Sequence, residues 1–350
     1  MCSNKACITE IRSDSCPDCF FCGARGTFLY KKLADRIFGA PGEWNFKKCL
    51  NAECGVIWLD PQPRADDIVK AYRHYYTHNA PDSVNKTAQR PFYHFLKKKY
   101  WAQRYGYVDG SLPFRDKIIG LTIALNPLRK ASLDSEVMYL PVKYNGKLLD
   151  LGCGNGKRLE LMRDLGWLVE GIDFDENAVR SAQRKGLQVH CGTLHEIHYP
   201  EDHFDAIMMS HVFEHIYEPI ELLRECYRIL KPNGYLVIVT PNNESLSHRV
   251  FKRNWRGLEP PRHLHIMSMK SLRRAVLDVG FRIHSIRSHV LSSYVYRSSY
   301  ALSKNIQFDN GKASLNFIQS KILGLFAFVN SLISLLHRNL GDNLVVIAIK

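Results

Sequence analysis

In the stretch Leu148-Leu149-Asp150-Leu151-Gly152-Cys153-Gly154-Asn155-Gly156, an apolar run leads into a loop with glycine at every second position. The helical pattern from Lys157 to Leu165 follows, so the sequence predicts a strand, a tight loop and a helix. Glycine allows positive φ angles and lets a ligand approach the N–H groups at the start of a helix. A purely structural turn needs only one glycine, so three of them beside Asp150 favour a ligand-binding loop.

The loop departs from the pattern that binds dinucleotides. The G-x-G-x-x-G fingerprint would require a third glycine at position 157, where this chain has Lys157. The stretch instead resembles motif I of the class I S-adenosylmethionine (SAM) dependent methyltransferases, whose usual form is close to LDLGCGxG. This resemblance implies that SAM is the cofactor and that the loop wraps its amino-acid end. The residues implied there are Asp150, Gly152, Cys153, Gly154 and Gly156.

The rest of the chain predicts an α/β fold. From Val142 onward, predicted strands alternate with helices at the pace of a parallel, doubly wound sheet. The last strand, Asn343 to Ile349, should insert beside the sixth, Phe281 to Ser288, after a helical insertion over 291–340. This order resembles the Rossmann-like seven-stranded methyltransferase sheet, with its final antiparallel strand. We therefore expect a methyltransferase domain over 142–350, preceded by a helical linker or cap over 64–141.

The first part of the chain, residues 1–63, is rich in loops and cysteines. Its two cysteine pairs are Cys19 with Cys22 and Cys49 with Cys54. Two separated pairs predict a zinc ribbon, with Cys16 as a competing ligand and free thiols as the alternative interpretation. Four thiolates leave no open position, so the zinc would be structural. The segment resembles the zinc-binding modules that precede some small-molecule methyltransferases, including those acting on sugar nucleotides.

The composition indicates which cellular compartment and which partners suit the chain. The 350 residues carry a formal net charge of +14, which suits nucleic acid, a membrane surface or an anionic substrate. The excess is spread along the chain, so a solvated basic surface is the simpler interpretation and nucleic acid is not the favoured partner. The polar start, Met1 to Glu10, has no secretory h-region, and clustered cysteines suggest metal in a reducing compartment. We expect a cytoplasmic protein.

Later strand ends supply further cofactor-binding candidates. Asp173, at the carboxyl end of the second strand, can accept hydrogen bonds from both ribose hydroxyls, as the residue at this position does in the methyltransferase family, and Phe174 follows it. Thr193 and Leu194 lie after the third strand, where the family contacts adenine; a plain loop is the alternative there. Ser210 opens the segment Ser210-His211-Val212-Phe213-Glu214-His215, which the resemblance implies lines the methyl-transfer cleft.

Histidines are the candidate catalytic residues. Methyl transfer is an in-line displacement, so the enzyme mainly positions the acceptor and removes a proton from it, a task that suits histidine near neutral pH. The candidates are His211, His215, His263 and, further, His265. Any one histidine taken alone is more often structural. Glu214 with His211 and His215 could also hold a divalent metal, and Arg262 could grip an anionic acceptor group such as a diphosphate.

The acceptor is predicted only by class. The Asn/Asp-Pro-Pro-aromatic signature of methyltransferases that act on the exocyclic nitrogens of bases is missing after the fourth strand, which favours an oxygen or carbon acceptor. We expect transfer to a small or lipid-linked molecule, such as a sugar, glycan or quinone-like intermediate. The alternatives are an RNA methyltransferase and a non-catalytic SAM-binding scaffold.

One apolar run, residues 321–337, bears on membrane contact. It is predicted to be too short and too interrupted by polar residues to span a bilayer. The simpler interpretation is a helix packed on the core or on another subunit. The other is peripheral contact with a membrane or with a lipid-linked substrate.

Overall fold

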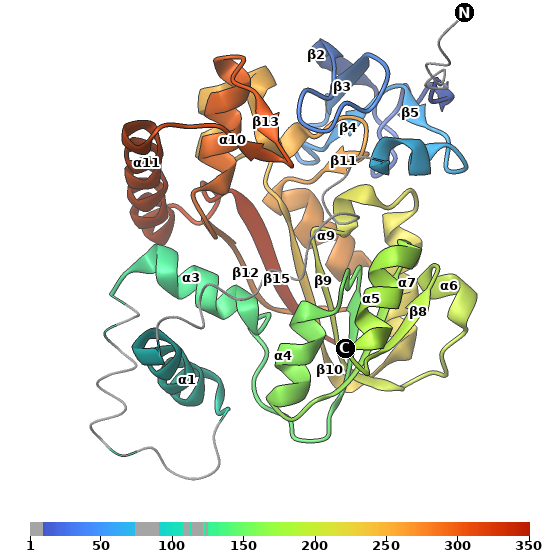
Figure 1. Cartoon of the computed structure of the whole chain (residues 1–350). Coiled ribbons are helices and arrows are strands. Elements are labelled where there is room, and N and C mark those ends of the chain that lie inside the picture. The colour runs from blue at the N-terminus through green and yellow to red at the C-terminus, as the bar shows by residue number, and fades with distance from the viewer. Residues whose placement is uncertain (1–9, 74–90, 108–112, 114–121, 123–124) are drawn as a thin grey trace, which may run out of the picture.

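The computed structural model describes residues 10–73, 91–107, 113, 122 and 125–350, and its centre is a seven-stranded sheet (Figure 1). The strand order is β12-β15-β10-β9-β6-β7-β8. β15 pairs antiparallel with both neighbours, and the other adjacent strands pair in parallel. This confirms the Rossmann-like methyltransferase sheet predicted from the sequence. The strands are β6 (Lys147–Leu151), β7 (Leu168–Asp173), β8 (Gln188–Cys191), β9 (Phe204–Ser210), β10 (Leu230–Pro241), β12 (Arg282–His289) and β15 (Asn343–Ile349).

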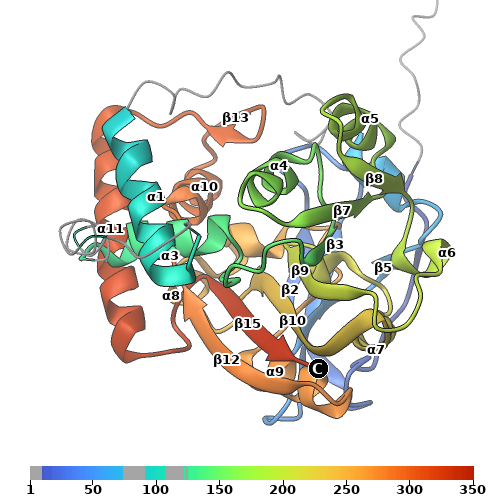
Figure 2. The same ribbon diagram turned by 90° about the horizontal axis from the view of Figure 1, so that it is seen from below.

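Helices cover both faces of the sheet, because its strands are apolar on both sides (Figure 2). The neighbouring residues Leu148 and Leu149 are both fully buried, and they belong to different cores. The core around Leu148 includes α3 (Pro127–Glu136), α4 (Lys157–Asp164) and α5 (Glu176–Arg184). The core around Leu149 includes α7 (Pro219–Ile229) and α9 (Met269–Asp278). The carboxyl ends of the parallel strands are therefore the edge where a ligand can enter.

A second sheet forms the N-terminal part, and it is not confined to residues 1–63. Its strand order is β11-β4-β3-β2. Three strands come from the N-terminal part, namely β2 (Gly26–Leu33), β3 (Trp44–Cys49) and β4 (Ile57–Leu59). The fourth, β11 (His265–Ile266), comes from the methyltransferase part and pairs antiparallel with β4. Trp255 and Leu258 also enter the core of this sheet beside Trp44, so the two parts share one packed interface.

A buried cation fastens these two parts together. Arg262 is only 1% exposed, and its guanidinium donates to Asp35 Oδ2 at 2.8 Å, Glu259 Oε1 at 3.0 Å and Ala71 O at 2.8 Å. Asp35 lies in the β2–β3 connection, and Ala71 lies in the 3₁₀ helix η1 (Ile68–Tyr72). Because a buried charge must be paired and hydrogen-bonded, these contacts fix the parts relative to each other. The prediction that Arg262 grips an acceptor was wrong, since its side chain is enclosed by protein.

The helical linker is described only in part. The sequence predicts a helix from Asp66 to His78, but its described portion forms only the short η1, and residues 74–78 lie outside the described residues. A helical pair is also predicted over 116–140, with a break at Asn126-Pro127, and most of its first helix lies outside them too. Asn126 caps α3 by accepting a hydrogen bond from Arg129 N at 3.1 Å. α1 (Pro91–Tyr105) packs on α3, and α3 in turn packs on α11 (Phe317–Leu336).

Helix α11 turns its apolar face outward. Its buried residues include Ala327, Asn330 and Ser331, and Asn330 Nδ2 donates to the hydroxyl of Tyr296 on α10 (Tyr294–Ser303) at 2.5 Å. The exposed large residues of the helix are Phe317, Ile318, Ile322, Leu325, Phe326, Val329, Leu332, Leu335 and Leu336. With 20 residues, α11 is the one helix among those described that is long and apolar enough to cross a membrane. The sequence-based estimate of its length was therefore too small.

Candidate active site

The glycine loop between β6 and α4 has the left-handed backbone that its sequence predicts. Gly152, Gly154 and Gly156 have φ values of +70°, +55° and +76°. A Cβ on Gly152 would lie 2.3 Å from Val212 Cγ2, and one on Gly156 would lie 2.4 Å from Leu187 Cδ1, so both are needed for close packing. A Cβ on Gly154 would meet nothing within 4 Å. Gly154 therefore faces open space, as a ligand-binding position requires.

Two buried carboxylates flank this loop. Asp173, at the end of β7, accepts hydrogen bonds from Gly154 N at 2.7 Å and from Asp175 N at 2.9 Å. Asp150 Oδ1 is buried and has no hydrogen-bond partner among the residues that the structure describes. Burial, opposed by the charge of Arg158 and assisted by the neighbouring Asp173, raises the pKa of Asp150 to about 7. A cationic ligand would relieve both effects, and SAM carries two cationic groups, an ammonium and a sulfonium.

The other predicted cofactor residues lie around the same edge, but they do not all present side chains to it. Phe174 is 55% exposed and packs edge-on against Tyr72, with ring centroids 5.1 Å apart. Cys153 is buried and turns its thiol into the core, so it can contribute only backbone to the loop. Ser210 ends β9, and Arg158 Nη2 lies 3.5 Å from its hydroxyl.

The two residues predicted to contact adenine, Thr193 and Leu194, interact with other parts of the protein. The Thr193 hydroxyl forms a capping box with Glu196 at the start of α6 (Leu194–Ile197). Leu194 is only 4% exposed and packs in the core, which leaves little of its side chain for an adenine ring. Phe174 is the exposed apolar side chain at this edge.

A buried carboxylate brings the candidate histidines together. Glu214 lies in the 3₁₀ helix η4 (Phe213–His215), directly after β9, and it is fully buried. Its Oε1 lies 3.2 Å from His211 Nδ1 and 3.9 Å from His263 Nε2, and its Oε2 accepts from the Thr240 hydroxyl at 2.9 Å. Burial alone would raise the pKa of Glu214, but the hydrogen bond from His211 and the nearby histidines lower it to about 2. The carboxylate is therefore ionised at neutral pH.

His211 is the candidate that remains accessible. Its side chain is 47% exposed, and its backbone has a φ of +57°, which is uncommon for a residue other than glycine. Because the ionised Glu214 can only accept, Nδ1 of His211 donates to it, and Nε2 is the nitrogen left for an acceptor molecule. This is the arrangement of an oriented general base.

His215 and His263 are held by backbone carbonyls. His215 Nδ1 donates to Arg262 O at 2.9 Å, and His263 Nδ1 donates to Gly257 O at 2.7 Å. Their rings lie 4.8 Å apart, and the Tyr72 hydroxyl is 3.0 Å from His215 Nδ1. Burial lowers the pKa of His263 to about 4, so its ring is neutral at physiological pH. These two histidines form the inner wall behind His211.

The predicted metal alternative involves a different set of residues. Glu214, His215 and His263 offer ligand atoms within 4.8 Å of one another. Both oxygens of Glu214, however, already have protein partners in His211 and Thr240, so the carboxylate is satisfied without a cation. His265 is a core residue, because it is 2% exposed and its Nε2 donates to Ile216 O at 3.0 Å.

The four predicted zinc ligands converge at the end of the second sheet. The Sγ atoms of Cys19 and Cys54 are 3.7 Å apart, those of Cys22 and Cys49 are 3.4 Å apart, and all four lie within 4.8 Å of one another. A tetrahedral zinc with Zn–S bonds of about 2.3 Å requires sulfurs about 3.8 Å apart, so the set fits this ion. Cys16 is outside the group, and its Sγ lies 3.8 Å from Asp14 O.

Comparisons with known proteins agree with this geometry. Residues 128–286 match a family model described as a methyltransferase domain. The chain contains a class I SAM-dependent methyltransferase domain. A probable SAM-dependent methyltransferase of Mycolicibacterium smegmatis is 30% identical over 102 residues, which are 29% of this chain and 40% of that protein. A ubiquinone biosynthesis O-methyltransferase of Xanthomonas oryzae pv. oryzae is 34% identical over 126 residues, which are 34% of this chain and 51% of that protein.

The alignments have a limited extent. The chain spans about half the length of the curated relatives it matches. Among solved structures, a SAM-dependent methyltransferase from Archaeoglobus fulgidus is 24% identical with a TM-score of 0.41, and the match covers 59% of this chain and 86% of that one. SAM is the cosubstrate of this family of methyltransferase domains.

Two residues of this site escaped the sequence analysis in their actual roles. The sequence predicts Glu214 only as a possible metal ligand, whereas in the structure its carboxylate contacts His211. Tyr72 lies in the linker and connects Phe174 with His215, and its sequence neighbours give no signal of that contact. The spacing of a glutamate three residues after His211 was the available sequence sign for Glu214; for Tyr72 there was none.

We expect Asp173→Asn to weaken SAM binding about 10- to 100-fold, because each hydrogen bond to a charged group contributes about 1.5–3 kcal/mol. Calorimetric titration of SAM into the full chain measures this effect. Asp164→Asn, at an exposed carboxylate ending α4, is the matched control and should bind like the wild type. Circular dichroism and thermal melting show whether the variant stays folded. Unchanged SAM affinity in a folded Asp173→Asn protein would contradict this role.

Proposed function

We propose that this methyltransferase transfers the methyl group of SAM to an oxygen atom of a small or lipid-linked acceptor, with His211 as the general base. The observation that carries the proposal is the contact of His211 Nδ1 with Glu214 Oε1, at 3.2 Å, beside the carboxyl end of β9. A half-exposed imidazole oriented by a buried carboxylate at this edge of the sheet has the geometry that proton removal from an acceptor needs.

The proton path follows from the charges. SAM, when bound, supplies an electrophilic methyl group on a sulfonium and leaves as the neutral thioether. The acceptor oxygen uses a lone pair to form the new C–O bond, and His211 Nε2 takes its hydroxyl proton. Glu214 then faces an imidazolium and stabilises its charge. General bases of this kind contribute about 10²- to 10⁴-fold in rate.

Oxygen is favoured over carbon as the acceptor atom by the relatives. Several of the curated matches are named ubiquinone biosynthesis O-methyltransferases, including one from Thiobacillus denitrificans that is 30% identical over 131 residues. A phenol-like or sugar-like hydroxyl suits an imidazole base better than an unactivated carbon does. We therefore propose a hydroxyl on a quinone-like, sugar or glycan intermediate.

A lipid-linked acceptor is favoured by the outward face of α11. This face carries nine large apolar residues, and the helix has Lys321 but no acidic residue. Nearby, α1 packs on α3, which also contacts α11 (Figure 2). Lys98 and Arg104 of α1 are exposed. An apolar helix face beside exposed cations matches the interface of an anionic bilayer. We propose that this face docks on such a membrane.

A structural zinc in the N-terminal part is also proposed. The four thiols fit a tetrahedral ion, and their hydrogen-bonded, largely buried setting leaves no position for a substrate. The zinc would stabilise the loops that end β3 and precede β4. These loops support the sheet that β11 completes, so the ion would act on the active site only through the fold.

His211→Asn should lower kcat by about 10²- to 10⁴-fold while the Kd for SAM stays unchanged, because the base is lost and the cofactor contacts are kept. Asparagine tolerates the positive φ of this position. The acceptor is first identified by mass spectrometry of lipid and metabolite fractions incubated with isotopically labelled SAM. His195→Asn, at an exposed histidine of α6, is the control. A kcat within threefold of the wild type would rule out His211 as the base.

Elemental analysis of the purified chain should find about one zinc per molecule. Cys22→Ser and Cys49→Ser should each lose the metal and lower the melting temperature. Cys16→Ser and the exposed Cys191→Ser should keep it, since neither thiol belongs to the cluster. Recovery of a folded wild-type protein without metal would remove the zinc from the proposal.

The full chain should co-sediment with vesicles of phosphatidylglycerol and phosphatidylcholine. The double variant Phe326→Glu with Leu335→Glu should bind at least tenfold less, because it puts two charges on the outward face of α11. Leu277→Glu, at a similarly exposed leucine on α9, controls for added charge. If the wild type ignores the vesicles and instead forms a dimer that the α11 variant disrupts, the face binds a second copy and not a membrane.

A further inference from the structure

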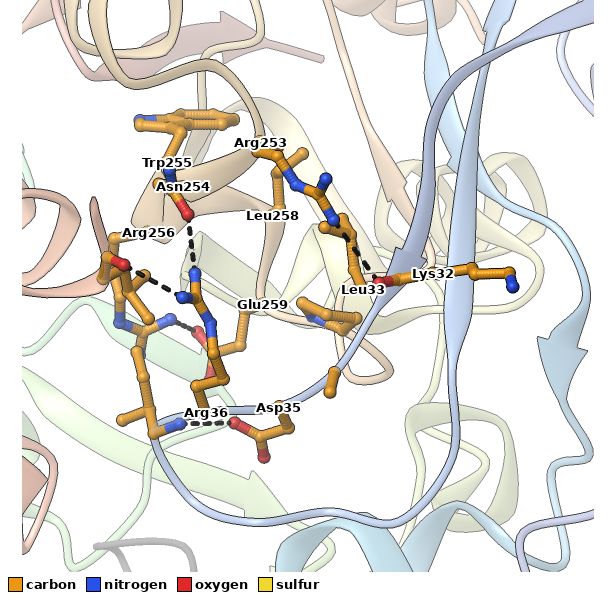
Figure 3. A pocket seen from close by; sticks show the side chains of 14 residues that line it. Lys32, Leu33, Asp35, Arg36, Arg253, Asn254, Trp255, Arg256, Leu258 and Glu259 are labelled. Atoms are coloured by element: carbon orange, nitrogen blue, oxygen red, sulfur yellow. Dashed lines mark hydrogen bonds and ion pairs between the residues drawn. The ribbon is translucent and has the colours of Figure 1, made fainter. Parts of the chain in front are cut away.

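A cavity lies where the N-terminal part meets the methyltransferase domain, away from the glycine loop (Figure 3). Its volume is about 240 Å³. The walls come from the β2–β3 connection, from the segment between α8 (Leu246–Phe251) and Arg262, and from the end of α10. Residues that matter for its chemistry are Lys32, Asp35, Arg36, Arg253, Asn254 and Glu259.

Two arginines of this cavity have only neutral partners. Arg36 Nη1 donates to Leu302 O at 2.9 Å and Asn305 Oδ1 at 3.0 Å, and its Nη2 donates to Asn254 Oδ1 at 2.7 Å. Arg253 Nη2 donates to the backbone oxygens of Lys31 and Lys32 at 3.4 and 3.5 Å. Among the described residues, neither guanidinium forms a salt bridge. Figure 3 shows both side chains reaching into the same space from opposite elements.

The acidic residues that line the cavity bind groups other than Arg36 and Arg253. Asp35 Oδ1 accepts from Ile37 N and Phe38 N at 3.0 Å each, and its Oδ2 accepts from Arg262 at 2.8 Å. Glu259 binds Arg262 through Oε1 and Arg256 through Oε2. These carboxylates therefore neutralise buried arginines and leave Arg36 and Arg253 uncompensated.

Arg36 and Arg253 also repel each other electrostatically. Burial lowers the pKa of Arg36, and the charge of Arg253 lowers it further. Two like charges that share a partly enclosed space raise its positive potential. An anion between them would remove the repulsion.

We propose that this cavity binds a phosphoryl group of the methyl acceptor. The two planar guanidiniums supply the forked donors that match phosphate oxygens, and the neutral Asn254 amide completes a polar wall. The volume is below the roughly 300–1,000 Å³ of sites that enclose a whole drug-sized ligand, so the site takes an anionic end group. The assignment of this group to the acceptor rests on the proposed methyl transfer; anion binding itself does not.

Glu259 connects the anion site with the histidine cluster. Its side chain lines the cavity, and its Oε2 lies 3.4 Å from His263 Nε2. The wall that separates the cavity from the histidines is therefore one side chain thick at this point. An anion held by Arg36 and Arg253 would therefore lie on the far side of Glu259 from His263.

The test uses the zinc-loaded full chain without SAM, so that it does not depend on methyl transfer. Pyrophosphate is titrated by calorimetry into the wild type, Arg36→Gln, Arg253→Gln and the charge-matched control Arg184→Gln, an exposed arginine that ends α5. The wild type and the control should bind one pyrophosphate, and each cavity variant should bind at least tenfold more weakly. Arg36→Lys, which keeps the charge but loses the fork, should recover only part of the affinity.

Further arms identify the source of the phosphoryl group. Uridine diphosphate and dodecyl phosphate are titrated into the same proteins, and tighter binding than pyrophosphate of one of them, lost in both cavity variants, assigns a nucleotide or a lipid source. SAM titration into every variant verifies that the methyltransferase domain is intact. Absence of pyrophosphate binding to the wild type, or equal binding to the variants and the wild type, overturns the proposal and leaves the two arginines as structural ties between the parts.

Discussion

Burial of one positive charge governs how the two parts of this protein meet. Arg262 lies in the segment between the two sheets, and its guanidinium finds acceptors in the β2–β3 connection, in η1 and in its own turn. Removing one partner from a buried ion pair lowers the stability of the fold by about 3–5 kcal/mol, because the remaining charge is buried without a partner or solvent. The N-terminal sheet therefore cannot move independently of residues 259–265. His263, one of the two histidines behind His211, belongs to that same segment.

The contacts of Arg262 continue towards Glu214, the partner of the candidate base His211. Ala71 O accepts from Arg262, and the next residue, Tyr72, contacts both His215 and Phe174. Leu264 N donates to Glu214 O, and Leu59 N donates to Leu264 O, so a single hydrogen-bonded path runs from β4 to η4. Glu214 is held in place from its backbone as well as through Thr240. The N-terminal part is thus a support for the position of Glu214, whatever ion or ligand it also binds.

The fold could be predicted because its signals are local. The glycine loop, the alternation of apolar strands with capped helices such as α5, and the last apolar strand each depend on neighbouring residues, and the strand order follows from the methyltransferase resemblance. The cysteine pairs likewise predicted a cluster that the structure contains. What the sequence did not reveal was burial: Leu194 enters the core, and Arg262 is enclosed. Polar or loop-bound residues reveal their burial only when distant segments cover them.

The charges around Arg262 explain why a basic cavity lies beside buried ion pairs. Asp35 is next to Arg36 in the sequence, yet its carboxylate turns to Arg262, and Glu259 pairs with Arg262 and Arg256. Arg36 and Arg253, 217 positions apart in the sequence, are left with carbonyl and amide oxygens alone. Both side chains are exposed, so an anion in solution can reach the guanidiniums that no carboxylate among the described residues neutralises. An anionic ligand in the cavity would supply the negative charge that the lining itself has committed to Arg262 and Arg256.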